Sequence, residues 1–172
     1  ADVAQAAVKA GASMVNDISS GDMDEAMIPV VAALRTPYIC MHMQGTPDTM
    51  QKDPQYENVS LTVLDYLAGK VDQCRKAGMD DIIIDPGFGF GKTIAHNFAL
   101  LQSLPALQII KRPVMVGLSR KSTIYKTLHI TAEEALNGTT VLHTIALMNG
   151  ANILRVHDVR AAKEAIDLFM AY

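Results

Sequence analysis

The chain has 172 residues, 49% of them hydrophobic, and a formal net charge of −3. This composition is typical of one globular domain with a sizeable core, and it excludes a disordered or fibrous chain. The negative balance argues against a general attraction to nucleic acid or to an anionic membrane, and the longest apolar runs are too short to cross a bilayer, so neither partner is expected.

Short apolar runs recur along the chain and predict β-strands. Continuous apolar runs of this length, separated by helices, are typical of parallel strands that are buried on both faces. The expected strands lie at 13–18, 38–43, 81–85, 114–118 and 152–158.

Helical patterns fill the intervals between the predicted strands. The opening segment DVAQAAVKAGA is typical of a helix that ends at Gly11. Residues 63–74 repeat apolar side chains at spacings of mostly three and four, and Gly78 ends that helix. Thr131 and Glu134 predict a capping box ahead of a long helix that ends at Gly150. Asp158 predicts the cap of the last helix.

Polar side chains follow every predicted strand. They are Asn16, Asp17, His42, Asp85, Ser119, Arg120, Lys121, Arg155, His157 and Asp158. Polar groups at so many strand ends favour a (β/α)8 TIM barrel over an open doubly wound sheet, whose ligand crevice lies at one switch point. A complete barrel takes about 250 residues. We therefore expect residues 1–172 to be a single α/β domain, a partial barrel of about five C-terminal βα units, with the other units preceding Ala1.

The segment IIIDPGFGFGKT, residues 82–93, is similar at first sight to a nucleotide-binding loop. A Walker loop needs glycine where Pro86 stands, and proline has no N–H to offer a phosphate. The dinucleotide motif also fails, because Gly87, Gly89 and Gly91 lack its wider second gap. We interpret the glycines instead as residues that let a strand-end loop bend tightly beside a flat ligand.

Asp85 and Asn16 are the candidates for contacts with that ligand. Asp85 follows three isoleucines, so its carboxylate needs a cationic or strongly donating partner, such as a heterocycle with an amino-amidine edge. The alternative for Asp85 is a turn cap at Pro86. Asn16 offers a donor and an acceptor to the same kind of edge, or to the backbone of a nearby loop.

Two basic pairs follow the last two predicted strands. Arg120 and Lys121 lie in LSRKS, and Arg155 and His157 lie in LRVHD. Against a negative overall charge they predict a local site for phosphate or diphosphate, with a solvated basic patch as the alternative. Because Arg155 and His157 flank Val156, strand alternation predicts that both point to one side.

The remaining candidates have structural interpretations. His42 is expected to be a core or rim histidine with a satisfied partner, and the five histidines show no zinc-ligand spacing. Cys40 and Cys74 form no C-x-x-C pair, which fits reduced thiols in a cytoplasmic protein better than a disulfide.

Five motifs, in this order and at these spacings, closely resemble the dihydropteroate synthase family: VNDIS, MHMQGTPDTMQ, IIIDPGFGFGKT, GLSRKS and LRVHDV. The resemblance covers the whole chain and corresponds to the C-terminal two-thirds of the family. It implies a (β/α)8 barrel that condenses 6-hydroxymethyl-7,8-dihydropterin diphosphate with 4-aminobenzoate. The products are 7,8-dihydropteroate, an intermediate of folate biosynthesis, and diphosphate, formed by a dissociative displacement at the pterin methylene.

The resemblance also implies roles for the residues around the pterin. Asn16 and Asp85 would hold its amino-pyrimidine edge, Lys121 would bond to it from the rim, and Met41 would pack near it. The resemblance further implies a cytoplasmic homodimer. It implies a Mg²⁺ cofactor whose ligand precedes Ala1, with no metal ligand in residues 1–172.

The other implied contacts are with the diphosphate and the second substrate. Arg155 would lie over the pterin face and bind diphosphate together with His157, near Ser119. Phe90 and Ser122 would line the 4-aminobenzoate pocket. The residues expected to take part in catalysis are Lys121, Arg155 and His157.

Two other functions remain open on the sequence. A pterin-binding domain of a folate-dependent methyltransferase would share the barrel and the asparagine and aspartate contacts, but it needs no diphosphate site. A non-catalytic relic of the barrel would act through a partner chain.

Overall fold

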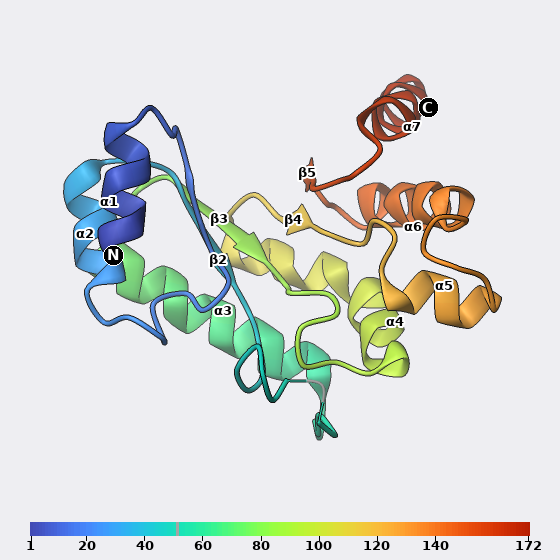
Figure 1. Ribbon diagram of the computed structural model, residues 1–172, viewed down its shortest axis with the longest axis horizontal. Helices are drawn as coiled ribbons and strands as arrows, with labels where there is room; N and C mark the ends of the chain where they lie inside the picture. The colour runs from blue at the N-terminus through green and yellow to red at the C-terminus, as the bar shows by residue number, and fades with distance from the viewer. Residues whose placement is uncertain (51) are drawn as a thin grey trace.

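Helices and parallel strands alternate through the structure, a computed structural model that describes residues 1–50 and 52–172 (Figure 1). The strands are β1 (Val15–Asp17), β2 (Tyr38–Met41), β3 (Ile82–Asp85), β4 (Met115–Val116) and β5 (Ile153–Leu154). The helices are α1 (Asp2–Lys9), α2 (Met27–Leu34), α3 (Val59–Lys76), α4 (Ile94–Gln102), the 3-10 helix η1 (Leu104–Ile110), α5 (Ser122–Leu128), α6 (Leu136–Met148) and α7 (Val159–Ala171). Each predicted strand is confirmed, in a shorter form. Gln51, the last residue of the second motif, lies outside the described residues.

The strands pair in chain order. β1, β2 and β3 form one parallel sheet, in which Tyr38 is the partner of both Val15 and Ile82. β4 and β5 form a second parallel pair, and a bridge between Ile84 and Val114 links the two sheets. The fold is therefore α/β with parallel strands, and the carboxyl ends of the strands lie at one edge.

Strand side chains alternate between two apolar clusters. The larger cluster faces the helices, and it joins strand residues such as Cys40 and Ile84 to Leu67 of α3. The smaller cluster consists of Ile39, Ile83, Met115 and the partly buried Ile153. Because strand side chains alternate with a period of two, the next position of this second set along β3 is Asp85. Arg155 follows Ile153 by two residues and lies directly after the end of β5. The alternation thus directs Asp85 to the face of the smaller cluster.

The predicted helix signals are only partly confirmed. Gly78, with φ +90°, follows α3, and Asn58 caps the start of that helix by accepting from two backbone N–H groups at 3.1 Å. The predicted capping box does not start α6. Glu134 accepts from the N–H of Thr131 at 2.9 Å, but the helix begins only at Leu136. Asp158 does occupy the N-cap position of α7, without a capping hydrogen bond from its side chain.

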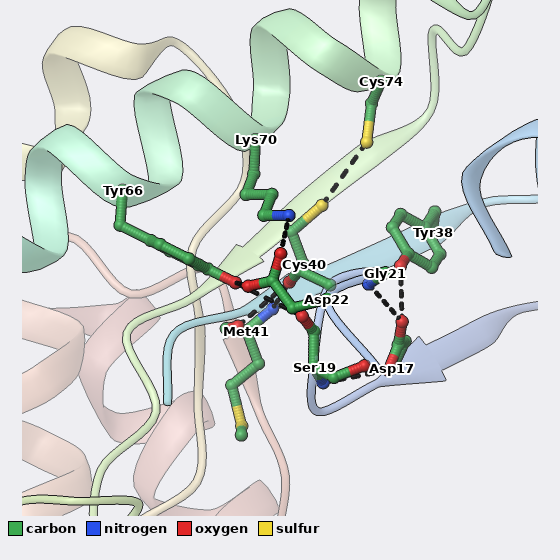
Figure 2. A network of polar contacts seen from close by, with 11 residues as sticks. Asp17, Ser19, Gly21, Asp22, Tyr38, Cys40, Met41, Tyr66, Lys70 and Cys74 are labelled. Carbon is green, nitrogen blue, oxygen red and sulfur yellow. Dashed lines mark hydrogen bonds and ion pairs between the residues drawn. The ribbon is translucent and has the colours of Figure 1, made fainter. Parts of the chain in front are cut away.

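Asp17 fixes the loop that follows β1. Its carboxylate accepts hydrogen bonds from the Ser19 N–H at 2.9 Å, the Ser19 hydroxyl at 2.8 Å, the Gly21 N–H at 2.7 Å and the Tyr38 hydroxyl at 2.7 Å (Figure 2). Burial raises the pKa of Asp17, but these donors outweigh it and the net pKa is lowered. Asp17 is thus a structural residue, and it holds the strand end that carries Asn16.

A second polar group joins the same loop to α3. Asp22 forms an ion pair with Lys70 and accepts from the Tyr66 hydroxyl at 2.7 Å (Figure 2). Cys40 and Cys74 lie beside this group with their Sγ atoms 3.7 Å apart. Both are free and buried, which confirms the prediction of structural thiols.

Candidate functional site

Asp85 lies at the centre of the candidate site, at the end of β3. Its side chain is 1% exposed. Oδ1 accepts from the Gly87 N–H at 2.8 Å, while Oδ2 lies 3.0 Å from Arg155 Nη1. That ion pair is not aligned as a hydrogen bond, and no described residue donates one to Oδ2. The turn cap and the cationic partner, which the sequence presents as alternatives, are therefore both present.

Arg155 links Asp85 to Asn16. Its Nη1 atom also donates to Asn16 Oδ1 at 3.2 Å, so side chains from the ends of β1 and β3 meet on one guanidinium group. The prediction that strand alternation directs both Arg155 and His157 is wrong, because β5 ends at Leu154.

His157 turns instead toward Ser119. The Ser119 hydroxyl lies 3.0 Å from His157 Nδ1 and accepts from the His157 backbone N–H at 3.2 Å. Ser119 is 3% exposed, so in this structure its hydroxyl orients the imidazole. The predicted contact between Ser119 and a substrate remains a prediction.

Arg120 does not contribute to the predicted anion site, and that part of the prediction is wrong. Its guanidinium binds both carboxylate oxygens of Asp158, at 2.8 and 2.9 Å, and donates to the Ala132 carbonyl at 3.0 Å. These acceptors hold the side chain away from the strand ends and explain why Asp158 does not cap α7. The basic residues left for an anion are Lys121, Arg155 and His157.

Lys121 lies against the glycine loop. Its ammonium donates to the Phe88 carbonyl and lies 4.8 Å from the centre of the Phe90 ring. Burial lowers the pKa of Lys121 to about 8, with Asp85 opposing the shift and Arg155 adding to it. Phe90 and Ser122, the residue that follows Lys121, are both half-buried. Met41 is fully buried and pairs with Asp85 in the sheet register.

The glycine loop packs against the backbone that follows β2. Gly87, Gly89 and Gly91 all have positive φ, at 70°, 81° and 62°. A Cβ on Gly87 would lie 1.9 Å from the His42 carbonyl oxygen, and one on Gly91 would lie 2.4 Å from that of Gln44. The predicted tight bend of the loop is confirmed. For Gly87 and Gly91, however, the close neighbour is the backbone that follows β2, where the prediction was a flat ligand.

Lys92 locks this loop, which the sequence does not reveal. Its Nζ atom lies 2.9 Å from His42 Nδ1 and 3.0 Å from the carbonyl oxygens of both Gly87 and Phe90. Burial and the nearby Lys92 lower the pKa of His42 to about 3, so the neutral ring accepts. The ammonium of Lys92 is therefore bound by acceptors of the protein itself. This agrees with the prediction that the segment is not a phosphate-binding loop. His42 is confirmed as a histidine with a satisfied partner.

Residues 1–50 and 52–172 present neither a metal-binding cluster nor a membrane-spanning helix. Within this part of the chain, no group of three or more histidine, cysteine, aspartate or glutamate residues is placed to hold a metal ion. None of its helices is both long and apolar enough to cross a membrane.

Comparison with known proteins gives consistent matches. The model of the family described as "Pterin binding enzyme" matches residues 1–157. Dihydropteroate synthase from Escherichia coli K12 is 39% identical over 167 residues, which are 96% of this chain and 59% of that protein.

Two solved structures of relatives are similar to this chain in both sequence and fold. The structure of dihydropteroate synthase from Thermus thermophilus in complex with 6HMPPP has a TM-score of 0.94 and 38% identity, covering 99% of this chain and 68% of that one. The enzyme from Xanthomonas albilineans in complex with 7,8-dihydropteroate has a TM-score of 0.90 and 38% identity, covering 99% of this chain and 63% of that one. The chain thus spans about three-fifths of the length of the curated relatives that it matches.

Proposed function

The chain belongs to the pterin-binding enzyme family, and we propose that it acts as a dihydropteroate synthase within a protein of the length of its relatives. The proposed reaction condenses 6-hydroxymethyl-7,8-dihydropterin diphosphate with 4-aminobenzoate to give 7,8-dihydropteroate and diphosphate, in folate biosynthesis. The observation that carries this proposal is the convergence of Asn16, Asp85 and Arg155, with Lys121 beside them. Relatives solved with 6HMPPP and with 7,8-dihydropteroate support the choice of substrate and product.

For the architecture, we propose that residues 1–172 are one domain and form the five C-terminal βα units of a (β/α)8 barrel. Support comes from the parallel strands in chain order and from the match to a longer structure at a TM-score of 0.94. In such a barrel the active site lies at the carboxyl ends of the strands, where the candidate residues are found.

In the proposed site, Asp85 and Asn16 bind the amino-pyrimidine edge of the pterin. Asp85 Oδ2 is buried and receives no hydrogen bond from the described residues, so a ligand N–H can satisfy it. Such a charge-assisted bond in a buried position is stronger than a bond between neutral groups. Met41 packs near the pterin ring.

Catalysis in this proposal is mainly electrostatic. Expelling diphosphate builds negative charge on the leaving group, and Arg155, His157 and Lys121 are placed to stabilise it. An arylamine is a weak nucleophile, which suits a dissociative displacement at the pterin methylene. Phe90 and Ser122 line the pocket that positions 4-aminobenzoate for attack.

Lys121→Ala in the full-length protein tests the assignment. We expect kcat/KM to fall about 50-fold, the size expected for one charged hydrogen bond. Because the pKa of Lys121 is lowered to about 8, the wild-type rate should fall as pH rises through that value, and the variant should lack this limb.

The matched control is Lys126→Ala, an exposed lysine of the same helix region, which should leave the rate unchanged. Undiminished turnover in Lys121→Ala would remove Lys121 from the site. A wild-type protein with no turnover would instead favour a non-catalytic relic of the barrel. A methyltransferase domain is less favoured, because it needs no diphosphate site and the proposal assigns Lys121, Arg155 and His157 to one.

We further propose a cytoplasmic location, which the free thiols of Cys40 and Cys74 support. Magnesium is proposed as a cofactor of the complete enzyme only. The described residues present no cluster that fits a magnesium ion, and the roles proposed for residues 1–172 do not involve one.

A homodimer through α6 and α7 is also proposed. These helices enclose a groove of about 480 Å³ lined in part by Met148, Leu168 and Phe169, and Leu168 is 75% exposed. Leu168→Glu is expected to convert the full-length dimer to a monomer in sedimentation. Val3→Glu on α1, where the side chain is 83% exposed, should leave the dimer intact. A dimer that persists in Leu168→Glu would place the interface elsewhere.

A further inference from the structure

The guanidinium of Arg155 lies on the atoms that the proposed ligand would use. Its Nη1 atom lies 3.0 Å from Asp85 Oδ2 and donates to Asn16 Oδ1 at 3.2 Å. These are the same two side chains that would hold the amino-pyrimidine edge of a pterin. Nη1 contacts Oδ2 without an aligned hydrogen bond and holds Asn16 Oδ1 with one, so a pterin that bonds to both side chains must displace it.

The competition has a chemical basis. A guanidinium is planar and carries N–H donors on one amidine carbon. The amino-amidine edge of a pterin presents the same arrangement of donors. Asp85 is 1% exposed, so a donor of this kind stabilises its buried carboxylate.

Gly117 provides the space for the guanidinium. A Cβ at position 117 would lie 2.7 Å from Arg155 Nη2 and 3.3 Å from its Cζ. The backbone of Gly117 does not have the positive φ that favours glycine. Glycine at position 117 is therefore explained by the space that the Arg155 side chain needs, and not by the backbone conformation.

We propose that Arg155 is a specificity-determining residue, which occupies the Asp85 and Asn16 site itself and leaves it more readily for a ligand that offers an anion in exchange. The inference rests on the proposed function. A pterin without diphosphate displaces the guanidinium and leaves it unpaired. A pterin diphosphate gives it a new partner, because the diphosphate carries the anionic oxygens that a guanidinium binds.

The first test uses Arg155→Met in the full-length protein. Calorimetry measures the affinity for 6-hydroxymethylpterin and for its diphosphate. We expect the affinity for the diphosphate to fall at least about tenfold and the affinity for the diphosphate-free pterin to rise by a similar factor. A merely structural role would weaken both ligands together. Equal or weaker binding of 6-hydroxymethylpterin overturns the proposal.

The second test is independent of any activity. Millimolar guanidinium chloride should raise the melting temperature of Arg155→Ala relative to the same concentration of sodium chloride. It should not do so for the wild type or for Arg160→Ala, which removes an arginine whose side chain is 94% exposed. Arg155→Lys, which keeps the charge without the planar group, should show a smaller shift and serves if Arg155→Ala does not fold.

The two tests separate the two proposals. A selective shift in Arg155→Ala, together with a wild-type protein that shows no dihydropteroate synthase turnover, would support the guanidinium site and reject the proposed function. The same shift in all three proteins would overturn the inference about Arg155 and leave the proposed function intact.

Discussion

Gly87→Ala is expected to lower the free energy of unfolding by about 4 kcal/mol, because the substitution combines backbone strain with a clash that cannot relax. The φ of Gly87 is +70°, and a Cβ there would lie 1.9 Å from the His42 carbonyl oxygen. That oxygen belongs to backbone next to β2, which pairs with β3 in the register of Met41 and Asp85. Relief of the clash must therefore separate the loop from the sheet. Urea unfolding followed by circular dichroism measures the effect.

Gly69→Ala is the matched control. Gly69 lies within α3, and nothing approaches within 4 Å of a Cβ added there. Because alanine has the higher helix propensity, this variant should be more stable than the wild type by up to about 1 kcal/mol. If Gly87→Ala is as stable as Gly69→Ala, the loop does not pack on the strand end as described.

The strand ends were predictable because the alternation of side chains is local. Asp85 follows Ile83 by two residues within β3, so alternation directs its side chain to the face of the smaller apolar cluster. The meeting of Asn16, Asp85 and Arg155 did not follow from alternation, because Arg155 lies beyond the end of β5; what could be predicted was their position at the carboxyl ends of strands. Their roles toward a ligand came from the resemblance to a family, and periodicity alone does not supply them.

The errors concern long-range partners. Arg120 and Lys121 are adjacent in the sequence, yet Arg120 binds Asp158, which is 38 residues away, and Lys121 reaches the loop of β3. The locking role of Lys92 was not predicted, because the carbonyl and imidazole acceptors around its ammonium are set by tertiary packing. A basic residue at a strand end can be located from sequence, but its partner depends on which loops fold back on it.

Asp85→Asn should weaken the binding of 6-hydroxymethylpterin by about 100-fold, because the amide that replaces the carboxylate has no charge to strengthen the ligand hydrogen bond. The amide oxygen can still accept from Gly87, so the loop should keep its conformation. Asp65→Asn, at an exposed position of α3, is the control for loss of one negative charge. Calorimetry on the full-length proteins gives both affinities, and a change of less than about threefold in Asp85→Asn would exclude Asp85 as the pterin carboxylate.

The same substitution in an Arg155→Met background shows whether the two side chains compete. In the wild type, Asp85→Asn removes both the anchor of the ligand and the ion pair that the ligand must break, so part of the loss is offset. Without the guanidinium there is no ion pair to break, and the loss should grow to about 1,000-fold. An equal loss in both backgrounds would mean that Arg155 does not occupy the ligand position. A larger loss of 6-hydroxymethylpterin affinity in the Arg155→Met background would mean that the guanidinium and the pterin bind the Asp85 carboxylate alternately.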